Sequence, residues 1–183
     1  MKQFMIVDVD RCWGCKSCMV ACKKGHGIIP GNLSFVSVFR VENKGKDDSV
    51  NCDFIPISCQ HCKDAVCMSK CPKKAIYRAE DGTVLINREL CVGCGLCSSV
   101  CPYGAISMYK NTGDEKKYPY KCDLCASRRE RGAETYCSQH CPGKVFSLVS
   151  EDSLEAEKGK HSFSYSVGQV VYVSDVIHLN ERF

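Results

Sequence analysis

Alternating apolar and polar positions predict several short β-strands along the chain. Residues 1–10 form one such segment, and residues 35–41 and 51–57 form two more on either side of a charged stretch at 44–48. The first segment predicts an N-terminal strand. The other two predict a hairpin whose tip is solvated, within an insertion that spans residues 30–58.

A second hairpin is predicted further along the chain. Residues 75–78 and 83–87 alternate in the same way around an Asp81-Gly82 turn, and residues 104–106 begin a matching strand. Residues 169–177 form a plausible strand in a C-terminal extension, 150–183, that has no cysteine. We expect this extension to cover the core or to dock on a partner.

Predicted helices are short. Residues 19–24 and 98–100 follow closely spaced cysteines, and residues 126–131 form a third candidate with Gly132 as its stop signal. The charged segment 153–160 is a fourth candidate. Short strands and short helices together predict an α+β protein.

Cysteine is the outstanding feature of the composition, with 17 cysteines in 183 residues. Sixteen of them fall into four motifs, I to IV, that each end in C-x3-C, and a proline follows the last cysteine of motifs II, III and IV. In chain order the motifs are Cys12, Cys15, Cys18 and Cys22; Cys59, Cys62, Cys67 and Cys71; Cys91, Cys94, Cys97 and Cys101; and Cys122, Cys125, Cys137 and Cys141. Motifs I and III have identical spacing, so the chain contains an internal repeat.

This spacing is typical of iron–sulfur ligation. A C-x2-C-x2-C loop wraps three corners of a cubane cluster, and the fourth cysteine ligates the other cluster in two-cluster ferredoxins. Four motifs therefore predict four [4Fe–4S] clusters in two interlocked pairs, with these sixteen cysteines as the iron ligands. A zinc-dependent binding module, such as one for RNA, is an alternative, but zinc sites use two separated cysteine pairs. An odd cysteine count argues against a disulfide framework.

Charge and hydropathy narrow the class of protein further. The formal charge is +4, but four oxidised clusters of roughly −2 each, ligands included, bring the total to roughly −4, which removes the case for nucleic-acid binding. The sequence has no run of 18 apolar residues, so we expect no membrane span. We recognise no signal peptide or twin-arginine leader and expect a reducing, cytoplasmic location.

Three of the motifs resemble those of iron–sulfur subunits of the dimethyl sulfoxide reductase type, over roughly residues 3–149. Small polyferredoxin subunits of tungsten aldehyde oxidoreductases, and of some hydrogenase and carbon-monoxide systems, are similar. The matching residues are Asp10-Arg11-Cys12-Trp13-Gly14-Cys15-Lys16-Ser17-Cys18 with Ala21-Cys22-Lys23; Cys59-Gln60-His61-Cys62; and Lys121-Cys122-Asp123-Leu124-Cys125 with Arg128 and Gly132.

The resemblance implies two ferredoxin-like modules, each of the bacterial 2[4Fe–4S] type, with nested pairing of motif I with IV and of II with III. The outer half would comprise residues 1–29 and 111–149, and the inner half residues 59–110. The implied ligand sets are Cys12, Cys15, Cys18 and Cys141; Cys22, Cys122, Cys125 and Cys137; Cys59, Cys62, Cys67 and Cys101; and Cys71, Cys91, Cys94 and Cys97.

Other notable residues near the motifs are expected to have roles other than ligation of iron. Cys52 lies outside them and is expected to be a buried or half-buried thiol. His61 and His140 adjoin ligands and are expected to hydrogen-bond sulfur or backbone, and so to tune the cluster potential. The basic run of Lys121, Arg128, Arg129 and Arg131 predicts a solvated face, with docking of an acidic partner as the alternative.

Fully thiolate-ligated clusters have no open iron position for a substrate, so the protein is expected to carry electrons and not to be an enzyme itself. The resemblance implies an electron-transfer subunit that serves a catalytic subunit with a molybdenum or tungsten pterin. A ferredoxin or a flavin subunit is a possible partner at the other end. The alternatives are a freestanding polyferredoxin, or the same relay serving a hydrogenase or a carbon-monoxide dehydrogenase.

Overall fold

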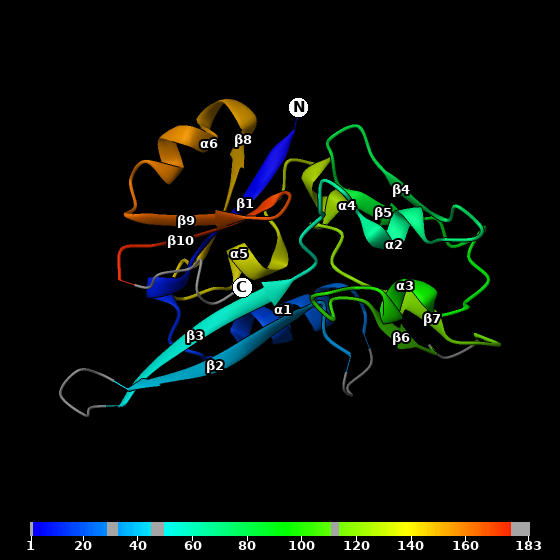
Figure 1. Ribbon diagram of the computed structural model, residues 1–183, viewed down its shortest axis with the longest axis horizontal. Helices are drawn as coiled ribbons and strands as arrows, with labels where there is room; N and C mark the ends of the chain where they lie inside the picture. Colours follow the sequence, from blue (N-terminus) through cyan, green and yellow to red (C-terminus); the bar gives the residue numbers. More distant parts are fainter. Residues whose placement is uncertain (1, 29–32, 45–49, 111–113, 177–183) are drawn as a thin grey trace.

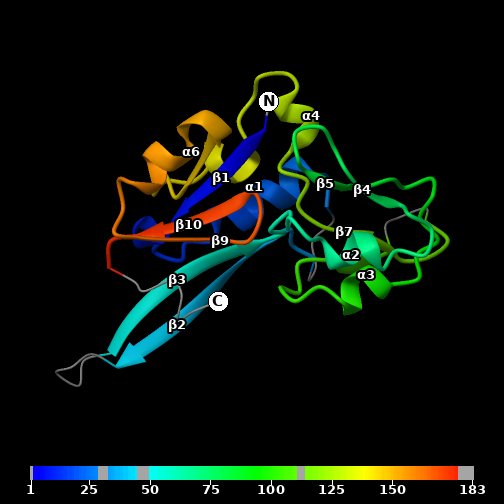
Figure 2. The same ribbon diagram turned by 45° about the horizontal axis from the view of Figure 1, so that its top comes forward.

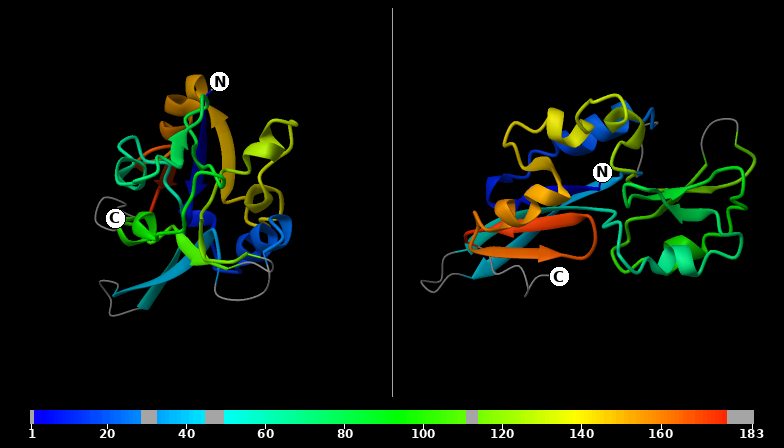
Figure 3. Two further views of the ribbon diagram at one scale, coloured as in Figure 1. Left: turned by 90° about the vertical axis from the view of Figure 1, so that its right-hand side faces the viewer. Right: turned by 90° about the horizontal axis from the view of Figure 1, so that it is seen from above.

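The computed structural model describes residues 2–28, 33–44, 50–110 and 114–176. Two lobes lie side by side along the long axis of the molecule (Figure 1). The large lobe contains residues 3–25 and 136–174, and the small lobe contains residues 66–109 and 118–120. Figure 3 shows the same two lobes from one end and from above.

A four-stranded sheet forms the centre of the large lobe. Its order is β8 (Phe146–Ser150), β1 (Gln3–Asp8), β10 (Val170–Ser174) and β9 (Phe163–Ser166). β1 pairs in parallel with β10, with Met5 opposite Val170, whereas its pairing with β8 is antiparallel. The C-terminal region therefore supplies a central strand of this sheet.

Alternation gives the sheet two apolar faces. Met5 and Tyr172 lie in the same hydrophobic cluster as the motif I thiols Cys18 and Cys22. The intervening residues, including Phe4, Ile6 and Val171, lie in a second cluster with Leu154, the one buried residue of helix α6 (Glu151–Lys158). One face of the sheet thus packs on the cysteines, and α6 covers the other.

Short helices position the cysteine motifs. In the large lobe α1 (Ser17–Gly25) packs against α5 (Tyr136–Gln139), and in the small lobe α2 (Val66–Ser69) packs against α3 (Leu96–Ser99). Thr135 caps α5, because its Oγ1 accepts a hydrogen bond from the Ser138 N–H at 3.3 Å. These contacts bring motif I to motif IV, and motif II to motif III.

Three hairpins complete the fold. β2 (Val36–Lys44) and β3 (Val50–Ser58) form a long ribbon that projects from the large lobe (Figure 2). In the small lobe β4 (Ile76–Arg78) pairs with β5 (Val84–Ile86), and β6 (Ser107–Tyr109) pairs with β7 (Tyr118–Tyr120). The remaining elements are the 3-10 helix η1 (Val9–Arg11) and the helix α4 (Ala126–Arg129) near the junction of the lobes.

Most predicted strands and helices are present, with shifted ends. The N-terminal strand and the first two predicted hairpins are confirmed. The strand expected to begin at 104–106 begins at Ser107, and the last strand ends at Ser174; residue 177 lies outside the described residues. The helix predicted at 126–131 ends at Arg129, although Gly132 does have the left-handed φ of +71°.

The expectation that helices follow the tight motifs was wrong in detail. α1 and α3 begin inside motifs I and III, at Ser17 and Leu96, one residue before the third cysteine. Helix α1 therefore carries Cys18 and Cys22, helix α3 carries Cys97, and each helix fixes the direction of its cysteines.

Candidate metal centre

The loops of the two tight motifs have the same backbone conformation. Gly14 and Gly93, two residues after the first cysteine, have φ of +75° and +73°, and Lys16 and Gly95, one residue after the second, have φ of +62° and +80°. Left-handed residues at these two places coil the loop so that it can close around one centre. The sequence repeat is thus a repeat of geometry.

The Cys-Pro turns that close motifs II, III and IV also share one geometry. The N–H of Lys74, Gly104 and Lys144 donates to the carbonyl oxygen of Cys71, Cys101 and Cys141 at 3.1, 3.2 and 3.1 Å, respectively. All three donors have left-handed φ, between +48° and +57°. Proline suits the second position of such a turn, so the turn fixes the direction of each closing cysteine.

Backbone N–H groups donate hydrogen bonds to several of the cysteine sulfurs. Ala75 N donates to Cys71 Sγ at 3.3 Å, and Val145 N donates to Cys141 Sγ at 3.4 Å, in each case four residues after the cysteine. Leu124 N donates to Cys122 Sγ at 3.4 Å. Donors of this kind stabilise thiolate sulfur and raise the reduction potential of a bound cluster.

Four cysteines line each of three cavities. One, of about 240 Å³, is lined by Cys59, Cys62, Cys67 and Cys101. A second is lined by Cys71, Cys91, Cys94 and Cys97, and a third by Cys22, Cys122, Cys125 and Cys137. In each cavity the first three cysteines of one motif meet the last cysteine of another motif.

Burial raises the pKa of most of these thiols. The Cys18 pKa rises to about 12, because the side chain is buried and lies near Cys137, Cys12 and Cys141. Burial followed by Cys137 and Cys125 raises the pKa of Cys22. A cluster of buried thiolates is unfavourable without a cation, and iron bound by these cysteines would supply the positive charge that keeps them deprotonated. The donor set therefore fits an iron–sulfur group.

Exposure differs strongly among the sixteen cysteines. Cys15 and Cys94, the second cysteines of motifs I and III, are exposed. The buried ones are Cys18, Cys22, Cys59, Cys97, Cys125 and Cys141, and the half-buried ones are Cys12, Cys62, Cys67, Cys71, Cys91, Cys101, Cys122 and Cys137. Cys15 and Cys94 are therefore the motif cysteines most accessible to solvent.

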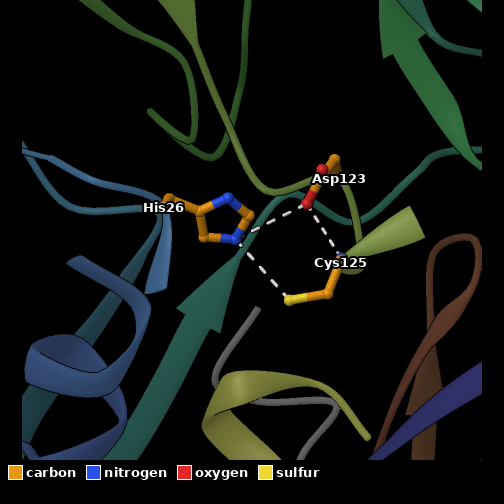
Figure 4. A group of neighbouring side chains, drawn as sticks. All are labelled: His26, Asp123 and Cys125. Carbon is orange, nitrogen blue, oxygen red and sulfur yellow. Dashed lines mark hydrogen bonds and ion pairs between the residues drawn. The ribbon is translucent and has the colours of Figure 1, made fainter. Parts of the chain in front are cut away.

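Sequence reasoning missed His26, which follows α1 and faces motif IV. Figure 4 shows its ring between Asp123 and Cys125, with Nε2 3.6 Å from Cys125 Sγ and 3.8 Å from Asp123 Oδ1. Asp123 Oδ1 in turn accepts the Cys125 N–H at 2.8 Å. In the sequence His26 lies four residues beyond the last cysteine of motif I, where no motif marks it.

The predictions for residues beside the motifs had mixed outcomes. His61 Nδ1 accepts the Val84 N–H at 3.0 Å and His140 Nδ1 lies 3.2 Å from the Tyr136 carbonyl, so both contact backbone, as expected. Cys52 is exposed, which corrects the expectation of a buried or half-buried thiol. Its Sγ accepts a hydrogen bond from Arg40 Nε at 2.9 Å on the exposed ribbon.

The prediction of a solvated basic face was wrong for two of its four residues. Lys121 is buried, and the Arg129 side chain is 8% exposed beside Asp81. Arg128 is half-buried against the Tyr136 ring, and Arg131 is exposed. Lys121 and Arg129 are buried at the junction of the lobes because polar groups of both lobes accept their hydrogen bonds there.

Loops of this geometry, buried thiols and cysteine-lined cavities define an iron–sulfur protein. Accordingly, the sequence matches the family described as a 4Fe-4S dicluster domain over residues 50–151. It is 33% identical over 160 residues to the B subunit of the anaerobic dimethyl sulfoxide reductase of Escherichia coli (strain K12), an alignment that covers 84% of this protein and 76% of that subunit.

Two further relatives have similar coverage. The thiosulfate reductase electron transfer subunit PhsB of Salmonella typhi is 33% identical over 156 residues, 84% of this protein and 79% of PhsB. YdhX, a ferredoxin-like protein of Escherichia coli (strain K12), is 36% identical over 154 residues, 84% of this protein and 67% of YdhX. The chain belongs to this family of iron–sulfur electron-transfer subunits, which confirms the resemblance, and it is not a catalytic subunit.

The structure mixes short helices with mainly antiparallel strands, and the family match identifies a 4Fe-4S dicluster domain within it. Within the described residues, no helix has the length and apolar character that a bilayer crossing requires.

Proposed function

We propose that the protein holds four [4Fe–4S] clusters and relays electrons to or from the catalytic subunit of an oxidoreductase. The observation that carries this proposal is the set of three cavities that four cysteines each line. When bound, the clusters supply one-electron transfer. The protein contributes ligands, N–H···S hydrogen bonds and the spacing between the centres.

The proposed ligand sets are nested. The three cavity sets, Cys22 with Cys122, Cys125 and Cys137, Cys59, Cys62 and Cys67 with Cys101, and Cys71 with Cys91, Cys94 and Cys97, leave Cys12, Cys15, Cys18 and Cys141 for the fourth cluster. Electrostatic interaction of the Cys12 thiol with Cys141 and Cys15 supports this remaining set. Packing of α1 on α5 and of α2 on α3 supports the pairing of motif I with IV and of II with III.

We propose that residues 1–29 and 111–149 form the outer ferredoxin-like half and residues 59–110 the inner half. Residues 30–58 are an inserted hairpin, and residues 150–183 are an extension. The pairing of β1 with β8 supports assigning both chain segments to one half. Because β10 lies between β1 and β9, the extension also completes the sheet that packs on the outer cysteines.

Interactions between sets support a linear relay. Cys18 lies near Cys137, Cys122 near Cys59, and Cys97 near Cys67, since each pair interacts electrostatically. The two end sets would then be those that contain Cys15 and Cys94, which are the exposed ligands. A relay with exposed ligands at its ends fits docking of one partner at each end.

The proposed partner is a catalytic subunit with a molybdenum or tungsten pterin. The names of the relatives, which are subunits of dimethyl sulfoxide and thiosulfate reductases, support that choice. A ferredoxin or a flavin subunit is proposed for the other end. Reduced thiols are needed for cluster assembly, which supports a cytoplasmic location.

Iron and sulfide analysis of anaerobically purified protein tests the cluster count. We expect about sixteen irons per molecule in the wild-type protein and in Cys52→Ser. Cys22→Ser should change the electron paramagnetic resonance signal of one cluster and leave three unchanged. About eight irons in the wild-type protein, or zinc in their place, would contradict the proposal. Purification without any catalytic subunit would favour a freestanding polyferredoxin.

A further inference from the structure

Lys121 is a buried cation at the junction of the two lobes. Its residue is 6% exposed, and its Nζ donates to the carbonyl oxygen of Cys122 at 2.9 Å and to the carbonyl oxygen of Val84. Val84 belongs to β5 of the small lobe, whereas Cys122 begins motif IV. No carboxylate within the described residues forms an ion pair with Lys121.

Carbonyl oxygens alone are weak compensation for such a charge. Moving an ammonium group out of water is costly unless a charge of opposite sign lies nearby. A carbonyl provides only part of a charge, so the site calls for an anion close to Lys121.

The surrounding charged groups do not provide that anion. Arg78, on β4, donates to the carbonyl oxygens of Cys62, Lys63 and Gly82 at 2.6 to 2.8 Å. Arg129 pairs with Asp81, so that carboxylate is already engaged. His61 is fully buried, and its pKa is well below the ordinary value because of burial and of the neighbouring Lys121, Arg129 and Arg78. The junction therefore carries an excess of positive charge.

Cysteine ligands from both lobes lie around this excess charge. The Cys67 thiol interacts electrostatically with Lys121, which lowers the pKa that burial and Cys59 raise. The Cys122 thiol interacts with Cys59 across the junction. Ligated iron–sulfur clusters carry a net negative charge, so they are the anions that the site lacks.

We propose that Lys121 is the built-in counter-ion of the two clusters at the junction, an inference that rests on the proposed function. One of these clusters is held by Cys59, Cys62, Cys67 and Cys101, and the other by Cys22, Cys122, Cys125 and Cys137. Reduction adds a negative charge to a cluster, and a desolvated cation nearby favours the reduced form. Lys121 thus raises both potentials and sets the energy of electron passage between the lobes.

The test compares three variants of the full protein. Lys121→Met removes the charge, Lys121→Gln removes the charge but keeps an N–H donor, and Lys121→Arg keeps the charge. Lys63→Met is the matched control, because Lys63 is also adjacent to a ligand cysteine but is exposed. Iron content is determined first, and the four midpoint potentials are then measured by redox titration with electron paramagnetic resonance.

In the Met and Gln variants, two of the four potentials should fall. Each of the two midpoint potentials should fall by at least about 59 mV. For a one-electron couple this lowers the ratio of reduced to oxidised cluster at a fixed solution potential at least tenfold. Lys121→Arg and Lys63→Met should shift no potential by more than a third of that. If the neutral variants lose iron but Lys121→Arg keeps it, the charge requirement is also supported.

Unchanged potentials in an iron-replete Met or Gln variant would overturn the inference. An equal shift in Lys63→Met would do so too, as would loss of iron from all three Lys121 variants, because the shape of lysine and not its charge would then matter. Fewer than four clusters in the wild-type protein would instead contradict the proposed function, so the two failures are distinguishable.

Discussion

The Arg129 guanidinium and the Asp81 carboxylate lie 2.7 Å apart and join α4 to the β4–β5 turn of the small lobe. The same guanidinium donates to Gln3 Oε1 on β1 at 2.8 Å and, through Nε, to the Leu124 carbonyl at 2.7 Å. One side chain therefore links the sheet of the large lobe, motif IV and the small lobe. This link holds the cysteines of the two lobes at a fixed separation.

Replacing Arg129 with methionine should loosen this junction. The variant leaves the Asp81 carboxylate, the Leu124 carbonyl oxygen and the Gln3 amide oxygen without their donor in a site that is largely buried. This costs about 2–3 kcal/mol of the free energy of unfolding. For a protein of this size the thermal midpoint should fall by roughly 5–10 °C, measured as loss of cluster absorbance under anaerobic conditions. Glu42→Gln is the control, because the Arg40–Glu42 pair is exposed and should change the midpoint by less than about 2 °C.

The sequence allowed the chemistry to be predicted better than the architecture. Spacing of cysteines is a local property, and the loops that it encodes have repeated left-handed residues such as Gly14 and Gly93. Strand alternation likewise revealed β2, β3 and β4. Helices of four residues are too short for a periodic pattern, and α3 and α4 were expected only from the tight spacing of motif III and from the stop signal at Gly132. The helices α2 and α5 lie in the wider motifs II and IV, without such a signal, and were missed.

Features that depend on distant contacts were not predictable. The C-terminal strand was expected, but its parallel pairing with β1 joins Met5 to Val170 across almost the whole sequence. Similarly, a run of basic residues normally lies on a solvated face. Burial of Lys121 and Arg129 depends on Val84 and Asp81, which lie 37 to 48 residues away.

Asp8 is expected to oppose folding near neutral pH. Burial, the largest influence, and the neighbouring Asp10 raise the Asp8 pKa above its ordinary value, and Oδ1 has no hydrogen-bond partner among the residues that the structure describes. A carboxyl with a raised folded-state pKa destabilises the fold at pH values above that pKa. Asp8→Asn should therefore raise the free energy of unfolding at pH 7–8 by less than about 1 kcal/mol after solvent screening, and with it the thermal midpoint.

The gain should shrink as the pH falls through the raised pKa and should vanish below the ordinary Asp pKa, because Asp8 is then neutral in both the folded and the unfolded chain. Thermal midpoints measured from pH 8 down to the lowest pH at which the protein keeps its iron provide the check. Asp175→Asn should behave in the opposite way, since the Ser162 N–H lowers the Asp175 pKa against a smaller effect of burial. A pH-independent gain in Asp8→Asn would show that charge is not its cause.

Gly93→Ala should destabilise motif III by more than the left-handed backbone conformation of residue 93 alone explains. Gly93 has a φ of +73°, and an added Cβ would lie 2.4 Å from the Lys117 carbonyl oxygen. Gly27 has a φ of +61°, but a Cβ there meets no atom of the described part of the chain within 4 Å. We expect Gly27→Ala to cost about 1 kcal/mol and Gly93→Ala at least twice that, together with loss of iron. Iron content and the thermal midpoint of both variants decide this, and equal effects would refute a steric cause.

His26→Phe should lower the potential of one cluster. The ring keeps its contacts with Phe35 and Tyr136, at centroid distances of 5.1 and 5.5 Å, but the Nε2 atom next to Cys125 Sγ is lost. With the proton on Nε2, the ring donates to the sulfur of a proposed ligand and favours the reduced cluster, so its removal should lower that potential by roughly 20–60 mV at fixed pH. Redox titration should show the other three potentials unchanged.

The matched control for this change is His140→Phe. His140 directly precedes the ligand Cys141 in the sequence, but its ring is exposed and lies 3.2 Å from the Tyr136 carbonyl oxygen, not from sulfur. The same substitution there removes an imidazole beside a ligand cysteine without removing a contact to sulfur. All four potentials of His140→Phe should therefore match the wild-type values. If both variants shift the same potential equally, the effect comes from general changes in polarity, and the contact between His26 and Cys125 has no special role.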